Sequence, residues 1–177
     1  IKILSIGSLT PKKGHKFLIE ALGLVNNKVP NSFVVNIIGQ GSLKEELLRK
    51  AKEESIDNIL KIIEPVSKQE LSNYYLDSDL FILSSKHEGC PNVLLEACAH
   101  GLACISTKVS GANDIISDNN SGKMVSIDST EELSDAIVYA INNRESVLAK
   151  WGGKARNKMI SGYSVEKHIE KLISIIQ

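Results

Sequence analysis

Residues 80–100 read LFILSSKHEGCPNVLLEACAH, and this stretch decides the fold. The four apolar residues 80–83 predict a buried strand, which ends at the small polar pair Ser84 and Ser85. A helix is predicted over 92–100, because apolar residues dominate it and Pro91 suits a helix entry. A buried strand, a loop and a helix together form the unit of a parallel sheet covered by helices on both faces.

The same unit recurs along the whole chain, without an internal repeat or a linker rich in glycine, serine or proline. Strands are predicted over 1–6, 33–38, 59–63, 80–83, 103–106 and 122–125. Helices are predicted over 17–25, 43–54, 68–76, 92–100, 113–116, 131–142, 145–160 and 165–176. The prediction is one α/β domain over residues 1–177: a doubly wound, Rossmann-like fold with a six-stranded, mainly parallel sheet and helices on both faces.

Helix starts are predicted at three hydroxyl residues. Ser42 stands before a helix with glutamates in its first turn, a pattern that resembles a capping box. Thr130 precedes two glutamates that the helix dipole favours, and Ser164 precedes a further acidic start. We therefore expect helices to begin directly after Ser42, Thr130 and Ser164.

Charge and cysteine usage exclude several classes of protein. Lys plus Arg and Asp plus Glu both number 21, so no basic excess indicates a nucleic-acid partner. The odd set of Cys90, Cys98 and Cys104 favours free thiols in a reducing, cytoplasmic compartment over a disulfide framework. A metal site on His87, Glu88 and Cys90 is rejected, because the downstream Cys-x-x-Cys pair is missing.

The length of the apolar runs and the first residues of the chain are also informative. No apolar run approaches membrane-spanning length. The chain opens in a strand without a methionine, so we expect the native protein to extend upstream of Ile1.

Ligands of doubly wound sheets bind beyond the carboxyl ends of the strands, so the loops that follow strands hold the candidate site. In the first such loop, Gly7 and Gly14 permit close backbone approach, and Lys13 precedes a helix where an anion is favoured. Lys13 is therefore a candidate phosphate ligand, although a solvated turn lysine fits the same pattern. The loop of Gly39 and Gly41 fits a turn close to a ligand, and a plain turn fits equally well, because the third glycine of a dinucleotide fingerprint is absent.

The loop after residues 80–83 carries the strongest signal. Glu88 and Gly89 lead through Pro91 into the predicted helix, whose free amides at Cys90 and at residues 92–94 are expected to face the ligand. Glu96 lies one turn into this apolar helix and needs a partner if it is buried, for which sugar hydroxyls are suitable. The alternative is a glutamate that only complements the helix dipole.

These residues resemble the carboxyl-terminal domain of the retaining glycosyltransferases with the GT-B fold, glycosyltransferase family 4. The resemblance runs through the whole chain and rests mainly on two glutamates eight positions apart, Glu88 and Glu96, with a glycine between them. Supporting motifs are the Lys13-Gly14 turn, the 39–41 loop, and the stretches 99–101, 110–114 and 154–164.

The resemblance implies a role for each matching residue. Lys13 and Glu88 are the implied catalytic residues: Lys13 contacts the donor diphosphate, and Glu88 positions the donor sugar. Glu96 holds the ribose hydroxyls, and the segment Pro65–Val66 seats the base. The full implied donor site is Gly7, Ser8, Lys13, Gly39, Gly41, Pro65, Val66, Glu88, Gly89, Cys90, Pro91, Asn92, Val93, Leu94 and Glu96.

Three positions depart from the family pattern. Ser8 stands where the family usually has an arginine that clamps the phosphate, and losing such a charge-assisted contact costs about 1.5–3 kcal/mol. Ser110 and Asp114 replace a common glycine and glutamate, and Ala103 replaces a frequent proline. The first departure leaves two interpretations, that Lys12 compensates for the missing arginine or that the donor binds weakly.

The implied reaction moves a sugar from a nucleoside diphosphate sugar, UDP above all, to an acceptor hydroxyl with retention, without a cofactor or metal. The implied setting is synthesis of a bacterial polysaccharide or glycolipid, in the cytoplasm or at the inner face of the membrane. The implied partners are an acceptor glycan or lipid-linked sugar and an amino-terminal acceptor domain absent from this chain. Without that domain we expect this chain to bind donor and transfer nothing. The alternatives are a sugar-nucleotide epimerase with the GT-B fold and a non-catalytic sugar-nucleotide-binding module.

Overall fold

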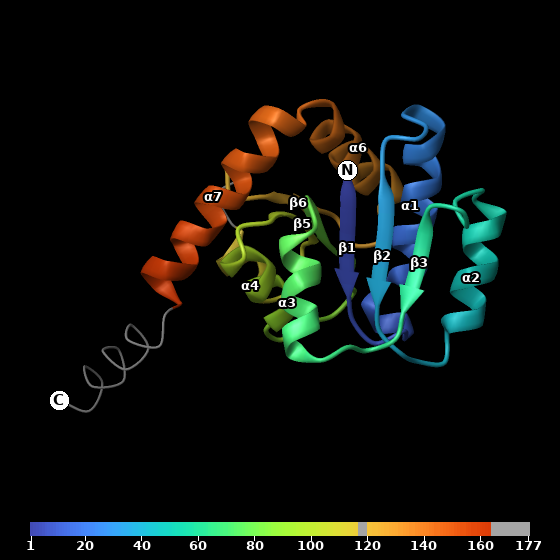
Figure 1. Cartoon of the computed structure of the whole chain (residues 1–177), viewed down its shortest axis with the longest axis horizontal. Helices are drawn as coiled ribbons and strands as arrows, with labels where there is room; N and C mark the ends of the chain where they lie inside the picture. The colour runs from blue at the N-terminus through green and yellow to red at the C-terminus, as the bar shows by residue number, and fades with distance from the viewer. Residues whose placement is uncertain (117–119, 164–177) are drawn as a thin grey trace.

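A computed structural model describes residues 1–116 and 120–163 of the chain. Within them six strands form one sheet in the order β3-β2-β1-β4-β5-β6, and every strand pair is parallel (Figure 1). The predicted doubly wound fold is confirmed. The strands are β1 (Lys2–Ile6), β2 (Val34–Ile38), β3 (Leu60–Ile63), β4 (Leu80–Leu83), β5 (Ala103–Thr107) and β6 (Lys123–Val125).

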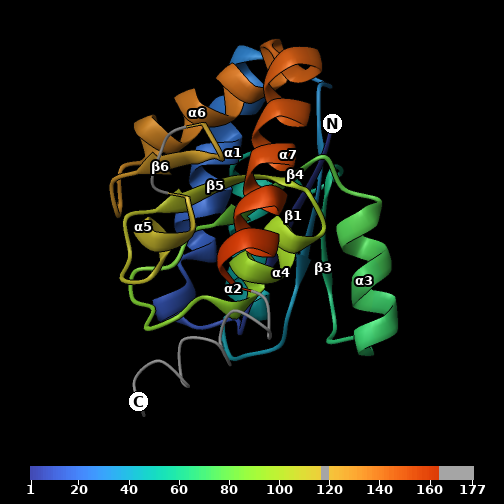
Figure 2. The ribbon, with the colours of Figure 1, turned by 90° about the vertical axis from the view of Figure 1, so that its left-hand side faces the viewer.

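Helices cover both faces of this sheet, and Figure 2 shows α3 on one side of it and α1 on the other. A 3₁₀ turn that the sequence analysis does not predict, η1 (Pro11–Lys13), precedes the first helix. The helices of the described residues are α1 (His15–Lys28), α2 (Lys44–Glu53), α3 (Lys68–Leu76), α4 (Asn92–Ala99), α5 (Ala112–Ile115), α6 (Thr130–Asn142) and α7 (Arg144–Gly162). The helix predicted over 165–176 and its start at Ser164 lie outside the described residues.

Side chains that alternate along the strands divide the core into two layers. Ile3 belongs to a cluster under α1, α2 and α6, which we call the α1-side core, whereas its neighbour Leu4 belongs to a cluster under α3, α4 and α5, the α4-side core. Helix α7 contributes to both, through Trp151 on the α1 side and Met159 on the α4 side. Both faces are therefore buried, as a parallel sheet requires.

Helix starts only partly follow the predicted caps. At α2 the N-cap residue is Leu43 and no side chain caps the helix, so the predicted capping box at Ser42 is wrong. The backbone explains this, because the Leu43 amide donates to the carbonyl oxygen of Leu9 in a neighbouring loop. At α6 the cap is Ser129, one residue before the predicted Thr130, and the Ser129 hydroxyl accepts from the Glu132 amide.

A capping box that the sequence analysis missed is present at α3. The Ser67 hydroxyl accepts from the Glu70 amide, and the Glu70 carboxylate accepts from the Ser67 amide. The Ser67 hydroxyl also donates to the Glu70 carboxylate, and this hydrogen bond, together with the one from the Ser67 amide, lowers the pKa of Glu70. The S-x-x-E spacing at 67–70 was the available signal.

No helix in the described part of the chain is both long enough and apolar enough to cross a membrane.

Candidate functional site

The topological switch point of the sheet lies between β1 and β4, which are adjacent although two strands and three helices separate them in sequence. On one side of it the chain winds toward β2 and β3, and on the other toward β5 and β6. The connections after β1 and β4 therefore leave the sheet in opposite directions and open a crevice at its carboxyl edge. These connections are residues 7–14 and 84–91, which contain both residues implied as catalytic, Lys13 and Glu88.

Direct contacts join the two loops. The Ser84 hydroxyl donates to the carbonyl oxygen of Lys13 at 2.9 Å, and the Lys86 amide donates to the carbonyl oxygen of Lys12 at 2.8 Å. Gly14, which follows Lys13, has a left-handed φ of 65°. Any side chain on Gly14 would overlap the carbonyl oxygen of Ser84. Gly14 is therefore required by loop-to-loop packing as well as by its backbone conformation.

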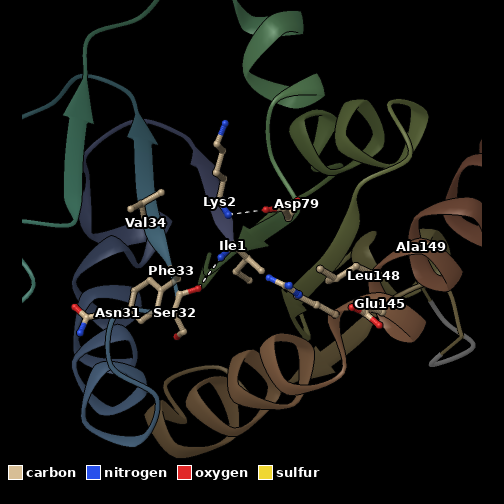
Figure 3. A pocket seen from close by; sticks show the side chains of 11 residues that line it. Ile1, Lys2, Asn31, Ser32, Phe33, Val34, Asp79, Glu145, Leu148 and Ala149 are labelled. Carbon is tan, nitrogen blue, oxygen red and sulfur yellow. Dashed lines mark hydrogen bonds between the residues drawn. The ribbon is translucent and has the colours of Figure 1, made fainter.

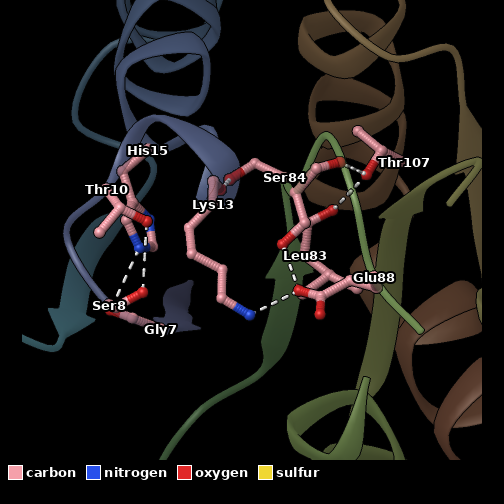
Figure 4. Close-up of polar contacts among 10 residues, drawn as sticks. Gly7, Ser8, Thr10, Lys13, His15, Leu83, Ser84, Glu88 and Thr107 are labelled. Carbon is pink, nitrogen blue, oxygen red and sulfur yellow. Dashed lines mark hydrogen bonds and ion pairs between the residues drawn. The ribbon is translucent and has the colours of Figure 1, made fainter. Parts of the chain in front are cut away.

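Lys13 and Glu88 meet at this junction, as Figure 4 shows. The Lys13 ammonium lies 2.6 Å from Oε1 of Glu88, and the side chains are 25% and 11% exposed. The Ser85 hydroxyl donates to the same carboxylate oxygen at 2.6 Å. Lys13 is the more exposed partner of this ion pair, so its ammonium can contact an incoming anion while the Ser85 hydroxyl continues to donate to Glu88.

Hydroxyl residues fix the position of Glu88, and the sequence analysis assigned them no role. Ser85 is 1% exposed, and its carbonyl oxygen accepts at 2.5 Å from the hydroxyl of Thr107, which is fully buried at the end of β5. Thr107 thus anchors Ser85, and Ser85 anchors Glu88. The available signal was polar residues at the ends of two otherwise apolar strands, 80–83 and 103–107.

His15, the first residue of α1, is a second member of the site that sequence reasoning passed over. It is 3% exposed, and its Nε2 faces the carbonyl oxygen of Gly7 at 3.4 Å. Because a carbonyl only accepts, Nε2 carries the proton in this contact, and the buried Nδ1 has no hydrogen-bond partner among residues 1–116 and 120–163. Burial, and then the nearby Lys13 charge, lower the pKa of His15 from 6.5 to about 4, against the opposing effect of the Gly7 hydrogen bond.

The first strand's loop presents the remaining predicted residues. Gly7 lies between the Lys13 stem and the His15 ring, both of which a β-carbon on Gly7 would contact. Ser8 is exposed, and its hydroxyl lies 3.3 Å from that of Thr10 rather than against Lys13. Ser8 therefore offers a solvent-facing hydroxyl at the position where the resemblance implies a cation.

The two glycines after β2 pack against protein backbone. A side chain on Gly39 would overlap the carbonyl oxygen of Gly7, and one on Gly41 would crowd the backbone of Leu9. The Leu9 amide also donates to the carbonyl oxygen of Gln40 at 2.9 Å. The spacing of these glycines is thus explained by contact between the β1 and β2 loops, before any ligand is considered.

Pro65 and Val66 follow the edge strand β3, two strands away from β1. Pro65 is exposed, whereas Val66 is half-buried against the α4-side core. The neighbouring Glu64 forms an ion pair with Lys44 at the start of α2. The structure therefore places this segment at the same carboxyl edge as Lys13 and Glu88 but on its outer side.

The start of α4 differs from the prediction of free amides. The Asn92 amide donates to the carbonyl oxygen of Cys90 at 3.0 Å, and the Leu94 amide donates to that of Pro91 at 2.9 Å. Both amides are thus used inside the turn, so the prediction of free amides is wrong for Asn92 and Leu94. Gly89, Cys90 and Asn92 are exposed, whereas Pro91 and Leu94 are buried and Val93 is half-buried.

Glu96 is exposed, so the burial that would require a partner for this carboxylate does not occur. It already has a partner in the protein, because the Tyr75 hydroxyl donates to its Oε2 at 2.9 Å. Helix α4 turns Leu94, Ala97 and Cys98 into the core, so position 96 falls on the opposite face. Exposure at the ligand edge leaves Glu96 available to a ligand.

A cavity of about 700 Å³ lies at the opposite end of the sheet, next to the amino ends of β1 and β2 (Figure 3). Its lining includes Lys2, whose amide donates to Asp79, and the exposed Val34. No residue of the candidate site lines it, and its position on the amino side separates it from the switch point. Among the described residues, no group of three or more histidines, cysteines or acidic residues is arranged to hold a metal ion.

A doubly wound parallel sheet with a lysine, two carboxylates and a helix start at its switch point defines a ligand-binding domain of the Rossmann type. Within this class, the chain belongs to the glycosyl transferases group 1, whose family model matches residues 1–158.

Individual relatives agree with this family. The chain is 28% identical over 170 residues to an Escherichia coli UDP-Gal:alpha-D-GlcNAc-diphosphoundecaprenol alpha-1,3-galactosyltransferase, covering 94% of this chain and 43% of the relative. A poly(ribitol-phosphate) alpha-N-acetylglucosaminyltransferase of Staphylococcus aureus is 26% identical, over 96% of this chain and 34% of the relative. The chain therefore spans less than half the length of these relatives.

Solved structures show the same fold. A variant of S. aureus TarM in complex with fondaparinux, alpha-GlcNAc-glycerol and UDP superposes with a TM-score of 0.89 at 25% identity, over 98% of this chain and 34% of that one. The C-terminal domain of the group 1 glycosyl transferase LpcC from Francisella tularensis gives a TM-score of 0.84 at 24% identity. In that case 93% of this chain covers 87% of the other, so the likeness is to one whole domain.

Proposed function

We propose that this chain is the donor-binding half of a retaining glycosyltransferase of family 4, and that it binds a UDP-sugar at the carboxyl ends of β1 and β4. The observation that carries the proposal is the meeting of Lys13 and Glu88 at the switch point, 2.6 Å apart and still open to solvent. A lysine ammonium at the switch point can bind a diphosphate, and a carboxylate beside it can accept hydrogen bonds from the hydroxyls of a sugar.

Each proposed role follows from the chemistry of the group. Lys13 stabilises the negative charge that builds on the leaving diphosphate, and the start of α4 adds a favourable dipole. Glu88 positions the donor sugar through hydrogen bonds accepted by its carboxylate. Glu96 accepts from the ribose hydroxyls. No metal is required in this proposal, because side-chain and helix charges replace it.

UDP as the leaving nucleotide is supported by two of the relatives. TarM was crystallised with UDP, and the name of the E. coli relative specifies UDP-Gal as donor. The same name specifies an undecaprenol-linked acceptor, which supports a lipid-linked sugar or glycan as acceptor and work at the inner membrane face.

The acceptor site belongs, in this proposal, to an amino-terminal domain outside this chain. The chain covers 43% of the E. coli relative, which leaves room for a second domain of similar size. We therefore expect the 177-residue chain to bind UDP-sugar and to transfer no sugar by itself. Transfer by the purified chain would contradict this part of the proposal.

One observation favours a second candidate, a non-catalytic sugar-nucleotide-binding module. Ser8 is exposed, and its hydroxyl lies beside that of Thr10, so a serine hydroxyl stands where the resemblance implies an arginine. Donor binding without transfer in the complete protein would favour this candidate over the transferase.

The test is a calorimetric titration of the purified chain with UDP, GDP and ADP, in buffer containing a chelator. We expect UDP to bind, and Lys13→Ala and Glu96→Ala each to weaken it at least tenfold, which corresponds to about 1.4 kcal/mol. Lys16→Ala is the matched control, because Lys16 is an exposed lysine of the same region that pairs with Glu46, and it should leave the affinity unchanged.

The Ser8→Arg variant extends this test. If Ser8 weakens the site, the variant should bind UDP about tenfold or more tightly than the wild type. Failure of the wild type and of Ser8→Arg to bind any of the three nucleotides at millimolar concentration would overturn the proposed donor site in this chain.

A further inference from the structure

The buried side chain of Tyr75 in α3 contacts the candidate site from the protein interior. The sequence analysis assigned it no role. Its side chain is 1% exposed, and its hydroxyl lies 2.9 Å from Oε2 of Glu96 and 3.3 Å from the carbonyl oxygen of Val93. A phenol has one proton to donate, and the shorter contact with a charged acceptor is the stronger of the two. Tyr75 therefore fixes the rotamer of Glu96 from inside the protein.

A second residue holds the same glutamate by its backbone. Nδ1 of His100 lies 2.8 Å from the carbonyl oxygen of Glu96, so this nitrogen carries a proton. Nε2 of His100 lies 2.9 Å from the hydroxyl of Ser72 on α3, and the imidazole stacks on the Tyr75 ring with centroids 4.8 Å apart. Ser72 and Tyr75 lie one turn apart on α3. Through His100 and Glu96, respectively, they hold the carboxyl-terminal half of α4 against α3.

This arrangement leaves part of the carboxylate unused. In the described part of the chain, the side chain of Glu96 has Tyr75 as its hydrogen-bond partner, through Oε2 alone. A carboxylate has about four acceptor positions, so Oε1 and a second lone pair of Oε2 remain for a ligand. Glu96 is exposed, so these positions face outward while Tyr75 holds the group from the core side.

We propose that Tyr75 is a positioning residue that orients Glu96 toward the ribose of the bound nucleotide and thereby sets the preference of the site for ribonucleotides over deoxyribonucleotides. The proposal rests on the proposed function, in which Glu96 accepts from the ribose hydroxyls. Burial, together with the hydrogen bond to Glu96, raises the pKa of Tyr75 far above its ordinary value, so the phenol remains a donor at neutral pH.

The experiment compares the affinities of UDP and 2′,3′-dideoxy-UDP for the wild type and for Tyr75→Phe. We expect the wild type to prefer UDP by about tenfold or more, since charge-assisted hydrogen bonds to the ribose are lost in the dideoxy compound. Tyr75→Phe should reduce this preference by about tenfold and leave the affinity for dideoxy-UDP unchanged. A purely structural role would instead weaken both ligands equally, and that result would overturn the proposal.

Two variants complete the design. Tyr74→Phe is the matched control, because Tyr74 is the neighbouring, half-buried tyrosine of α3, and it should retain the wild-type preference. In a Glu96→Ala background, which removes the acceptor of the Tyr75 hydroxyl, Tyr75→Phe should have no further effect on the preference. A further loss there would mean that Tyr75 acts on the ribose by a route other than Glu96, which would also overturn the proposal.

Different binding results would overturn the role of Tyr75 and the donor site itself. If the wild type binds neither ligand, the donor site itself is wrong and the role of Tyr75 falls with it. If the wild type prefers UDP and Tyr75→Phe keeps that preference in full, the donor site stands and the role of Tyr75 alone is overturned.

Discussion

His15 shows how a single buried side chain links the candidate site to stability. Its imidazole lies against Gly7, and burial together with the nearby Lys13 ammonium keeps it uncharged. A charge on His15 would be desolvated and would also repel the lysine that we propose as the phosphate ligand. The fold therefore favours the neutral form of His15 over the charged form.

This neutrality predicts a pH dependence of stability. The folded-state pKa of about 4 lies below the ordinary value of 6.5, so the unfolded chain binds more protons between these values. Stability from this group is complete above pH 6.5 and is lost as the pH falls toward 4, by up to about 1.4 kcal/mol per pH unit. Urea unfolding at pH 7, 6 and 5 measures the free energy of unfolding across this window.

A variant isolates the contribution of His15 from that of other groups. His15→Gln should show a shallower fall in unfolding free energy between pH 7 and 5, whereas His87→Gln, at an exposed histidine, should retain the wild-type slope. Equal slopes in the wild type and His15→Gln would contradict the assignment.

At the scale of elements, α7 docks on the sheet through one of two adjacent glycines. A side chain on Gly152 would overlap the carbonyl oxygen of Gly101, whereas one on Gly153 would meet open space. Helix interiors disfavour glycine, so each position requires a separate reason. Gly152 has one, because it lets the helix approach the chain just before β5.

The two glycines therefore predict opposite effects of the same substitution. Gly153→Ala should raise the free energy of unfolding by about 0.4–1 kcal/mol, because alanine favours the helix and restricts the unfolded chain. Gly152→Ala should lower it by about 1–3 kcal/mol, since the helix or the loop must shift. Chemical denaturation of both variants measures the difference, and a stabilised Gly152→Ala protein would show that α7 is not held at this contact.

At the scale of the whole molecule, the two core layers share one sheet. Leu4 and Ile3 are neighbours on β1 yet belong to the α4-side and α1-side cores, respectively. Helix α7 extends along both cores, with Trp151 packed on one side and Met159 on the other. Loss of packing in one layer should therefore lower the free energy of unfolding of both layers together.

Leu4→Ala tests this coupling. The variant should lower the free energy of unfolding by about 2–5 kcal/mol, the usual cost of a buried leucine-to-alanine change. Trp151 is the chain's single tryptophan and reports on the opposite layer. Its fluorescence and the far-ultraviolet circular dichroism should shift to the same lower denaturant midpoint.

Leu22→Ala, in the α1-side core, is the matched control and should shift both signals in the same way. A Trp151 transition that stays at the wild-type midpoint in Leu4→Ala would mean that the layers unfold independently.

The sequence by itself determined the order of elements, because that order depends on local pattern. Apolar runs such as 80–83 and turn residues such as Pro91 act within a few positions of themselves. The predicted strands fall within two residues of the observed ones at either end. The family resemblance at Lys13, Glu88 and Glu96 is likewise local, since each residue lies in a short motif beside a predicted strand or helix.

Tertiary structure alone decided which distant residues meet. Lys13 and Glu88 are 75 positions apart, and Tyr75 and Glu96 are 21 positions apart, so no local pattern encodes their contacts. The same holds for the helix starts: backbone contact with Leu9 sets the start of α2, which Ser42 alone suggested wrongly. Burial and long-range hydrogen bonds depend on strand order, and strand order is fixed only when the whole sheet assembles.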